Sequence, residues 1–152
     1  MERFEQPHKF KLIYVFSMPY ETHKGMLKVG EATLETDIKP NELLPNCHTL
    51  NQAAKDRIDS YTKTASISYK LEYTELARYL DCGEPVTFSD KDVHKVLMNS
   101  GVHKVQPNGA TGEEWFATNI ETVKAAIKAV KNAKSTLSSA DLVAETPQEP
   151  ID

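Results

Sequence analysis

The chain has 152 residues, of which 39% are hydrophobic and 26% are charged. This composition is typical of one globular domain and excludes a disordered chain. The formal net charge of -4 at pH 7 excludes a strongly basic nucleic-acid-binding protein, although it is compatible with a local basic groove.

Apolar runs are only a few residues long, so we expect no transmembrane helix and no signal peptide. The two cysteines, Cys47 and Cys82, favour a reduced, cytoplasmic protein over an extracellular disulfide framework. The cysteines and histidines between residues 47 and 103 lack the paired spacing of a structural zinc site.

Two strands are predicted first in chain order, at residues 10–17 and 26–32. A loop with Pro19 and Gly25 joins them, and they should pair as an antiparallel hairpin. The first strand has apolar side chains on both faces, which places it at or near the centre of a sheet. One face carries Phe10, Leu12, Tyr14 and Phe16, and the other carries Ile13 and Val15.

A helix and a third strand are predicted next. Thr49 and Gln52 form a capping-box pattern, which begins a helix that reaches about Thr62. Residues 65–76 alternate apolar and polar side chains and therefore predict a strand. Its apolar face would carry Ile67, Tyr69, Leu71 and Tyr73.

The C-terminal half begins with a turn at residues 81–85. Ser89 then caps a helix that ends before Gly101. Residues 102–118 indicate two short strands or one hairpin. Thr118 with Glu121 is a second capping-box pattern, which opens the last helix.

These elements predict an α+β domain in which helices flank a small central antiparallel sheet of about three strands. Residues 1–9 are expected to be a flexible N-terminus and residues 10–139 the folded domain. Residues 140–152 contain prolines and acids without periodicity, and they are expected to form an acidic linker or tail.

Tyr14 and Lys28 are the first candidate site residues, because both lie in the middle of the predicted hairpin strands. Alternation places Lys28 on the face opposite Leu27 and Val29. A lysine at that position either extends to solvent or points into a site. Tyr14 is alternatively a core side chain.

Arg57 and Tyr61 are four residues apart on one helix, and they share its face with the apolar stripe that includes Ile58. An arginine on an apolar stripe must be paired or directed at an anion. The alternative is an arginine at the edge of the stripe, paired with Asp56 or Asp59.

Asp90 and His94 form a similar pair on the next helix. Steps of about 100° place Asp90 nearer the apolar stripe than Asp92, so Asp90 should face the sheet. Alternatively, Asp90 only stabilises the positive end of the helix dipole. In residues 112–116, Glu113 or Glu114 could also approach a site.

Taken in order, these residues resemble the GIY-YIG nuclease superfamily, in particular its divergent phage-type branch. Residues 12–14 (LIY) stand where GIY would be, and residues 28–30 (KVG) where YIG would be. Residues 57–61 resemble the arginine motif, residues 90–94 resemble the segment in which an acid precedes a histidine by four, and residues 112–116 resemble the closing EWF signature.

The resemblance implies a GIY-YIG-like fold and hydrolysis of DNA phosphodiester bonds with one divalent metal, Mg²⁺ or Mn²⁺. Tyr14 would position or deprotonate the attacking water, and Lys28 would contact the phosphate or the water. Arg57 would stabilise charge on the phosphate. Tyr61 and His94 would complete the catalytic set, and Asp90 would bind the metal.

Two departures from the family pattern matter. The usual metal-binding acid is glutamate, and Asp90 is one methylene shorter, although it is still an oxygen ligand suited to magnesium. The interval between Gly30 and Arg57 is long and carries Pro40 and Pro45.

The alternative function is therefore a catalytically weak or inactive module that binds DNA or a protein through the same groove. A purely structural interaction domain is a third possibility. Because members of this branch are fused to helicase or restriction-type motor domains, such a domain is also an expected partner.

Overall fold

The computed structural model describes residues 8–62, 68–106 and 115–137. Its main feature is a long antiparallel hairpin of strand β1 (His8–Ser17) and strand β2 (Met26–Thr36). The pairing runs from His8 opposite Thr36 to Phe16 opposite Lys28. The short 3₁₀ helix η1 (Glu21–His23) lies in the loop between the two strands.

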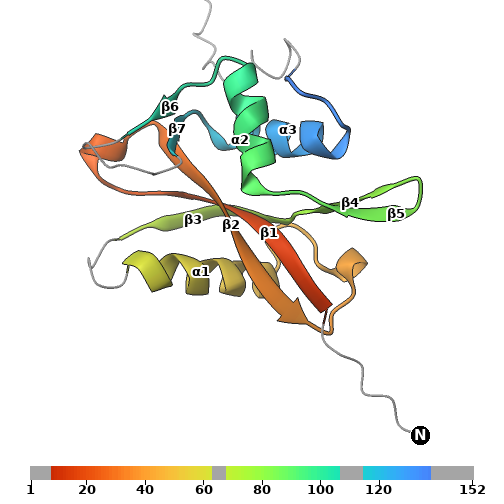
Figure 1. The fold of residues 1–152 in the computed structure, drawn as a ribbon. Coiled ribbons are helices and arrows are strands. Elements are labelled where there is room, and N and C mark those ends of the chain that lie inside the picture. Colours follow the sequence, from red (N-terminus) through yellow and green to blue (C-terminus); the bar gives the residue numbers. More distant parts are fainter. Residues whose placement is uncertain (1–7, 63–67, 107–114, 138–152) are drawn as a thin grey trace, which may run out of the picture.

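The hairpin lies inside a five-stranded sheet of order β3–β1–β2–β7–β6 (Figure 1). Its other members are β3 (Lys70–Leu76), β6 (Lys104–Val105) and β7 (Trp115–Ala117). Every pairing is antiparallel. The predicted fold class and the inner position of the hairpin are therefore confirmed. The sheet exceeds the three predicted strands because the short strands β6 and β7 join it.

Strands β4 (Arg78–Asp81) and β5 (Glu84–Thr87) form a separate two-stranded ribbon. Cys82 and Gly83 connect them, and both have positive φ, 50° and 84°. A two-residue loop with both residues in the left-handed region has a backbone twist that matches the twist of the two flanking strands, so it closes a tight hairpin. The sequence pattern predicted only the turn in this region.

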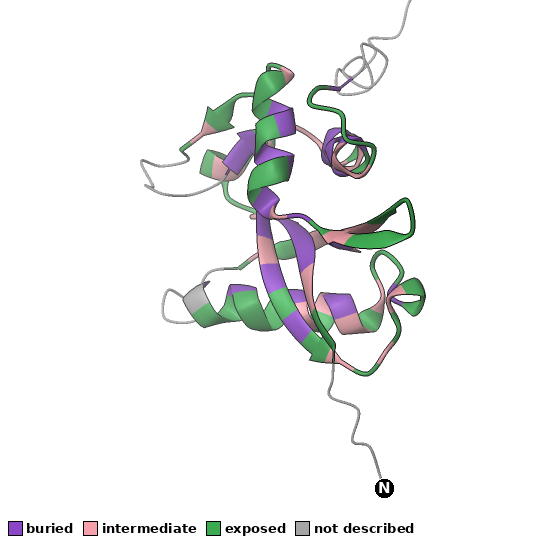
Figure 2. Cartoon of the chain, turned by 45° about the vertical axis from the view of Figure 1, so that its right-hand side comes forward, coloured by how far each residue is buried: buried purple, intermediate pink, exposed green. Residues whose placement is uncertain are grey.

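Helices cover both faces of the sheet. Helix α1 (His48–Thr62) lies on one face, after the short helix η2 (Pro40–Glu42). Helices α2 (Asp90–Asn99) and α3 (Ile120–Lys131) lie on the other face (Figure 1). Leu12, Tyr14 and Phe16 accordingly pack with α1, whereas Ile13 and Val15 pack with α2 and α3, as the alternation predicted. Figure 2 shows the buried residues along the central strands and the inward sides of the helices.

A β-bulge interrupts the pairing of β1 with β3. Val15 lies opposite Tyr73, but Phe16 lies opposite Leu71, so Glu72 is an extra residue in β3. A bulge shifts the alternation by one position. Leu71 therefore belongs to the α1 side and Tyr73 to the α2 and α3 side, and the predicted single face through Tyr73 is wrong.

The helix starts differ in part from the predicted ones. The Ser89 prediction is confirmed: the Ser89 N–H donates to the Asp92 carboxylate at 2.9 Å in a capping box. Helix α1 begins at His48, one residue before the predicted cap. Helix α3 is capped by Asn119, whose side chain accepts a hydrogen bond from the Thr122 N–H at 2.9 Å.

None of the helices in the described part of the chain is both long and apolar enough to cross a membrane. Some predicted features lie outside the described residues. These are the N-terminal residues 1–7, Ile67, Glu113, Glu114 and the predicted acidic tail, residues 140–152. The boundaries of the predicted domain stay a prediction.

Replacing the cap of α3 tests which residue begins that helix. Asn119→Ala should lower the free energy of unfolding by about 1 kcal/mol, because it leaves the Thr122 N–H without its acceptor. Thr118→Val is the matched control at the mispredicted cap. The Thr118 hydroxyl is buried without a hydrogen-bond partner among the described residues, so this change should be neutral or stabilising. Chemical denaturation measures both, and a larger loss from Thr118→Val would contradict the assignment.

Candidate active site along strand β2

Strand β2 has an outer neighbour only along its first three residues. It pairs with β7 only at residues 26–28, and beyond Lys28 no other described strand lies on the side of β2 away from β1. An unpaired side of a strand exposes backbone groups that other parts of a protein can bind. Three of the predicted site residues, Tyr14, Asp90 and His94, contact β2 just beyond this point.

His94 reaches the open side from α2. Its side chain is buried, and Nε2 lies 2.7 Å from the carbonyl oxygen of Val29. A carbonyl only accepts, so Nε2 is the protonated nitrogen and donates. The imidazole therefore satisfies a backbone acceptor that no strand covers, and it holds α2 against β2.

Tyr14 reaches the next residue of β2 from the opposite face of the sheet. A Cβ atom placed on Gly30 would lie only 2.5 Å from the Tyr14 hydroxyl oxygen and 2.6 Å from the adjacent ring carbon. The phenol thus lies directly over Gly30, and it is buried. Glycine is required here for close approach and not for an unusual φ.

Asp90 contacts Glu31, the residue that follows Val29 and Gly30 in β2. The Asp90 backbone N–H donates to the Glu31 carboxylate at 2.9 Å, so Glu31 binds the first turn of α2. Lys11 forms an ion pair with the same carboxylate at 3.1 Å. The Asp90 residue is 8% exposed, whereas Asp92 is exposed, which confirms the predicted difference between the two aspartates.

The pKa of Glu31 is shifted by these neighbours. Partial burial alone raises the pKa of a carboxyl group. The side chain and backbone N–H of Asp90, together with the Lys11 ammonium group, outweigh burial and hold the pKa of Glu31 below its usual value. Glu31 is therefore a carboxylate at neutral pH, beside the predicted metal-binding residue.

Lys28 is only 8% exposed and lies on the Tyr14 face of the sheet, opposite Leu27 and Val29 as predicted. Its neighbours across the two adjacent strands are Phe16 and Trp115. The aliphatic stem of the lysine is thus enclosed by aromatic side chains. The alternative of a solvent-exposed sheet lysine is wrong.

Arg57 departs from its predicted position. The buried residues of α1 recur every four positions, and Arg57, one step before Ile58, falls outside this narrow stripe and is exposed. It lines a surface hollow between α1 and a later part of β2. The other residues of this hollow include Thr33, Leu34, Glu35, Gln52 and Asp56. The side chain of Tyr61 is outside what the structure describes.

The site is therefore linear, with its members following β2. Lys28 comes first, His94 binds Val29, Tyr14 covers Gly30, Asp90 binds Glu31, and Arg57 lies beside residues 33–35. Glu31 is the residue that the sequence analysis missed. The sequence feature that could have identified it is a charged side chain on the strand face that otherwise carries Leu27 and Val29.

Two carboxylates, Asp90 and Glu31, are the oxygen ligands that this arrangement offers to a metal. Within the described residues no group of three or more histidine, cysteine or acidic side chains could hold a metal ion. Magnesium commonly binds one or two carboxylates and takes its other ligands from water and substrate phosphate. The donor set fits a magnesium ion completed by substrate, but not a metal site built only from protein ligands.

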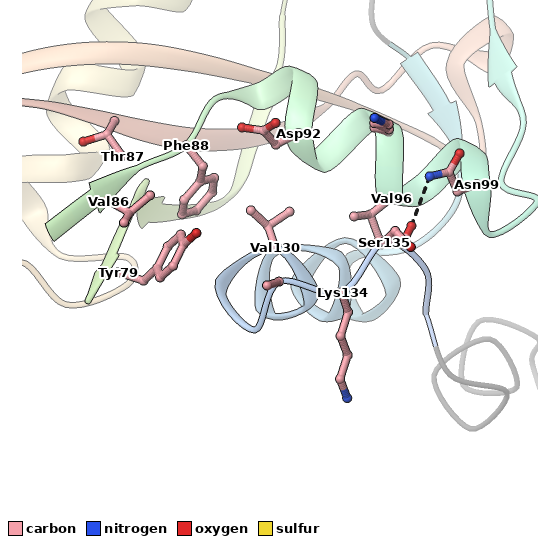
Figure 3. A pocket seen from close by; sticks show the side chains of 12 residues that line it. Tyr79, Val86, Thr87, Phe88, Asp92, Val96, Asn99, Val130, Lys134 and Ser135 are labelled. Atoms are coloured by element: carbon pink, nitrogen blue, oxygen red, sulfur yellow. Dashed lines mark hydrogen bonds between the residues drawn. The ribbon is translucent and has the colours of Figure 1, made fainter. Parts of the chain in front are cut away.

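A second hollow, of about 310 Å³, lies between β5, α2 and α3, and it carries none of the predicted site residues (Figure 3). Its floor includes Phe88, Val96 and Val130. The Asn99 amide donates to the Ser135 carbonyl at 3.2 Å and joins α2 to the segment after α3. This hollow is separate from the open side of β2.

Comparison with known proteins gives one match. The T5orf172 domain family matches residues 11–131, which include all the candidate residues described above. This domain is associated with nuclease-type proteins. No curated protein and no solved structure matches the chain.

The close approach of Tyr14 to Gly30 is open to a double-mutant test. Gly30→Ala should destabilise the protein by about 1–3 kcal/mol, because the new methyl group overlaps the phenol. In a Tyr14→Leu background the same change should cost clearly less, because the overlapping atoms are gone. Urea denaturation of the four proteins measures this coupling. Equal costs in both backgrounds would show that the phenol does not lie over Gly30.

The lowered pKa of Glu31 predicts a pH dependence of stability. A carboxyl group with a depressed folded-state pKa stabilises the protein above its unfolded pKa, and this contribution is lost as the pH falls through the folded value. The melting temperature of Glu31→Gln should therefore fall less than that of wild type when the pH is lowered from neutral to acidic. Glu35→Gln is the control, because that carboxylate is 60% exposed and lies 3.7 Å from Lys9. If both variants follow the wild-type curve, Glu31 is not stabilised as described.

Proposed function

The chain belongs to the T5orf172 domain family, and on that premise we propose that it is a GIY-YIG-type endonuclease domain that hydrolyses DNA phosphodiester bonds. One observation carries this proposal. Side chains from β1 and α2, on opposite faces of the sheet, meet three consecutive residues of β2, Val29 to Glu31. Tyr14 is the cross-strand neighbour of Gly30, and His94 binds the helix that carries Asp90 to the same strand, so these residues are held around one short stretch of β2.

Tyr14 and Lys28 act on the attacking water and the phosphate in this proposal. Both lie on the same face of the sheet and close to its open side. Tyr14 is held over Gly30 by packing, so its hydroxyl is positioned before substrate arrives. Lys28 supplies positive charge from an enclosed position, where the interaction with a phosphate oxygen is stronger than in water.

Asp90, with Glu31 beside it, would hold Mg²⁺ or Mn²⁺. A metal bound there neutralises and polarises the phosphate. The role of Glu31 within the chain is to fix Asp90, since its carboxylate binds the Asp90 N–H. His94 has a positioning role, because its Nε2 donates to Val29 and holds the helix that carries Asp90.

Arg57 contacts the DNA backbone in this proposal. Its exposed position beside residues 33–35 places a guanidinium on the line of β2, beyond the proposed metal site. An arginine binds phosphate with two donors at once, and it does so from an exposed helix face without the cost of burying an unpaired charge. Tyr61 stays a proposed catalytic residue. DNA is the proposed partner, with a helicase or motor domain beside it in a longer chain.

A second candidate function is a catalytically weak module that binds DNA or a protein through the same surface. The observation that favours it is a pair of departures, at Asp90 and at Arg57. Asp90 replaces the glutamate usual in the resembled superfamily, and Arg57 is exposed instead of facing the core. Activity with a divalent metal separates the two functions.

Plasmid nicking tests the proposed endonuclease. Wild-type protein should convert supercoiled DNA to the open form with Mg²⁺ or Mn²⁺ and not with a chelator. Arg57→Ala should reduce the rate at least about a hundredfold through loss of one charge-stabilising group. Its melting temperature should not change, because the side chain is exposed. Lys55→Ala, an exposed cation on the same helix outside the hollow, is the matched control and should keep the wild-type rate.

Substitutions at Asp90 extend this test to the metal. Asp90→Asn should abolish activity, because it removes the carboxylate charge, whereas Asp90→Glu should retain or increase it. Two results would contradict the proposal: wild-type protein that cuts no DNA with either metal, or an Arg57→Ala variant that unfolds.

A further inference from the structure

An aromatic surface lies at the end of the sheet near Lys28. Tyr20 is 40% exposed, and it is the aromatic member of the exposed large hydrophobic residues that the structure describes. Its ring centroid lies 5.9 Å from that of His23, and the His23 ring lies 4.9 Å from that of Trp115. These rings form a continuous path from the surface to the buried indole.

The path continues to the candidate active site. Trp115 contacts Phe16 edge-on at 5.5 Å, and Phe16 stacks with Tyr14 at 6.0 Å. Trp115 is also the cross-strand neighbour of Lys28. The exposed end of the aromatic path is therefore connected by direct packing to two residues of the proposed active site.

The exposed ring is held in place. The Tyr20 hydroxyl accepts a hydrogen bond from the Ser68 N–H at 3.0 Å, which joins the β1–β2 loop to the segment before β3. A ring fixed in this way loses little conformational entropy when another flat group stacks on it. A freely rotating surface tyrosine would lack this advantage.

Two lysines and one acid lie near these rings, the acid being the exposed Glu21 of the same loop. Lys24 follows His23 in the same loop and is exposed, and Lys28 lies next to Trp115. A flat aromatic surface with lysines nearby suits a nucleobase with its attached phosphate. Base faces are hidden in a duplex, so the group that fits is an unpaired base.

We propose that Tyr20 and His23 form a subsite that stacks an unpaired base of the DNA strand next to the phosphate bound at Lys28. This inference rests on the proposed endonuclease function and makes it more specific. The substrate would then be single-stranded DNA, or a junction or flap with an unpaired base, in preference to a continuous duplex.

Binding in the presence of a chelator tests the subsite separately from cleavage. The probe is a short oligonucleotide that contains 2-aminopurine, whose fluorescence is quenched when it stacks on an aromatic ring. Wild-type protein should quench the single strand and bind it more tightly than the same sequence in a blunt duplex. Tyr20→Ala should weaken single-strand binding about tenfold or more, as expected for the loss of one stacked base.

Two variants make the result specific. Tyr20→Phe keeps the ring and loses only the bond to Ser68, so its affinity should stay within about threefold of wild type. Leu80→Ala removes a different exposed apolar side chain, on β4, and should bind as wild type does.

The inference is overturned if Tyr20→Ala binds the single strand as wild type does, or if the blunt duplex binds equally well; nicking by the wild type would then still support the endonuclease. Quenching without any metal-dependent nicking would instead refute the endonuclease and leave a DNA-binding module with this subsite. Absence of binding to either DNA overturns the subsite as well.

Discussion

The arrangement of the molecule depends on where β2 loses its outer strand. Up to Lys28, the strand lies between β1 and β7; after Lys28, backbone groups on one side need other partners. Buried backbone acceptors are expensive to leave unsatisfied, and here a histidine side chain satisfies one of them. His94 binds the Val29 carbonyl, and Glu31 binds the first turn of α2. The chemistry-bearing residues thus also hold the sheet and helix together.

Because the same residues carry the proposed chemistry and join α2 to the sheet, a small chain can bring side chains from two faces of a sheet to one place. Gly30 has no side chain, so the Tyr14 phenol can lie directly over it on one face of the sheet. On the other face, α2 contacts the adjacent residue Val29 through His94. The two hydrophobic clusters, one under α1 and one under α2 and α3, fix these approaches independently. An active site at this position is supported by packing on both sides, which keeps its groups in place before substrate binds.

Local periodicity was sufficient to predict the hairpin, the sheet face on which Lys28 lies and the inward Asp90, because each depends on alternation or helical angle within one element. It failed for Arg57, since an apolar stripe at intervals of four is too narrow to include the residue before Ile58. It also failed at Tyr73, where a bulge moves the side chain to the other face. Glu31 carried one local signal, a charge on an otherwise apolar strand face, but its partner Asp90 is 59 residues away and no local pattern encodes that contact.

The proposed function requires that DNA binds along the open side of β2. Backbone amide shifts of ¹⁵N-labelled protein, measured as a short oligonucleotide is added with a chelator, test this claim most directly. The largest shifts should fall on residues 28–35 and on Asp90, at the start of α2. Shifts that gather instead around the separate hollow of Phe88, Val96 and Val130 would contradict it, because that surface shares no residue with the proposed site.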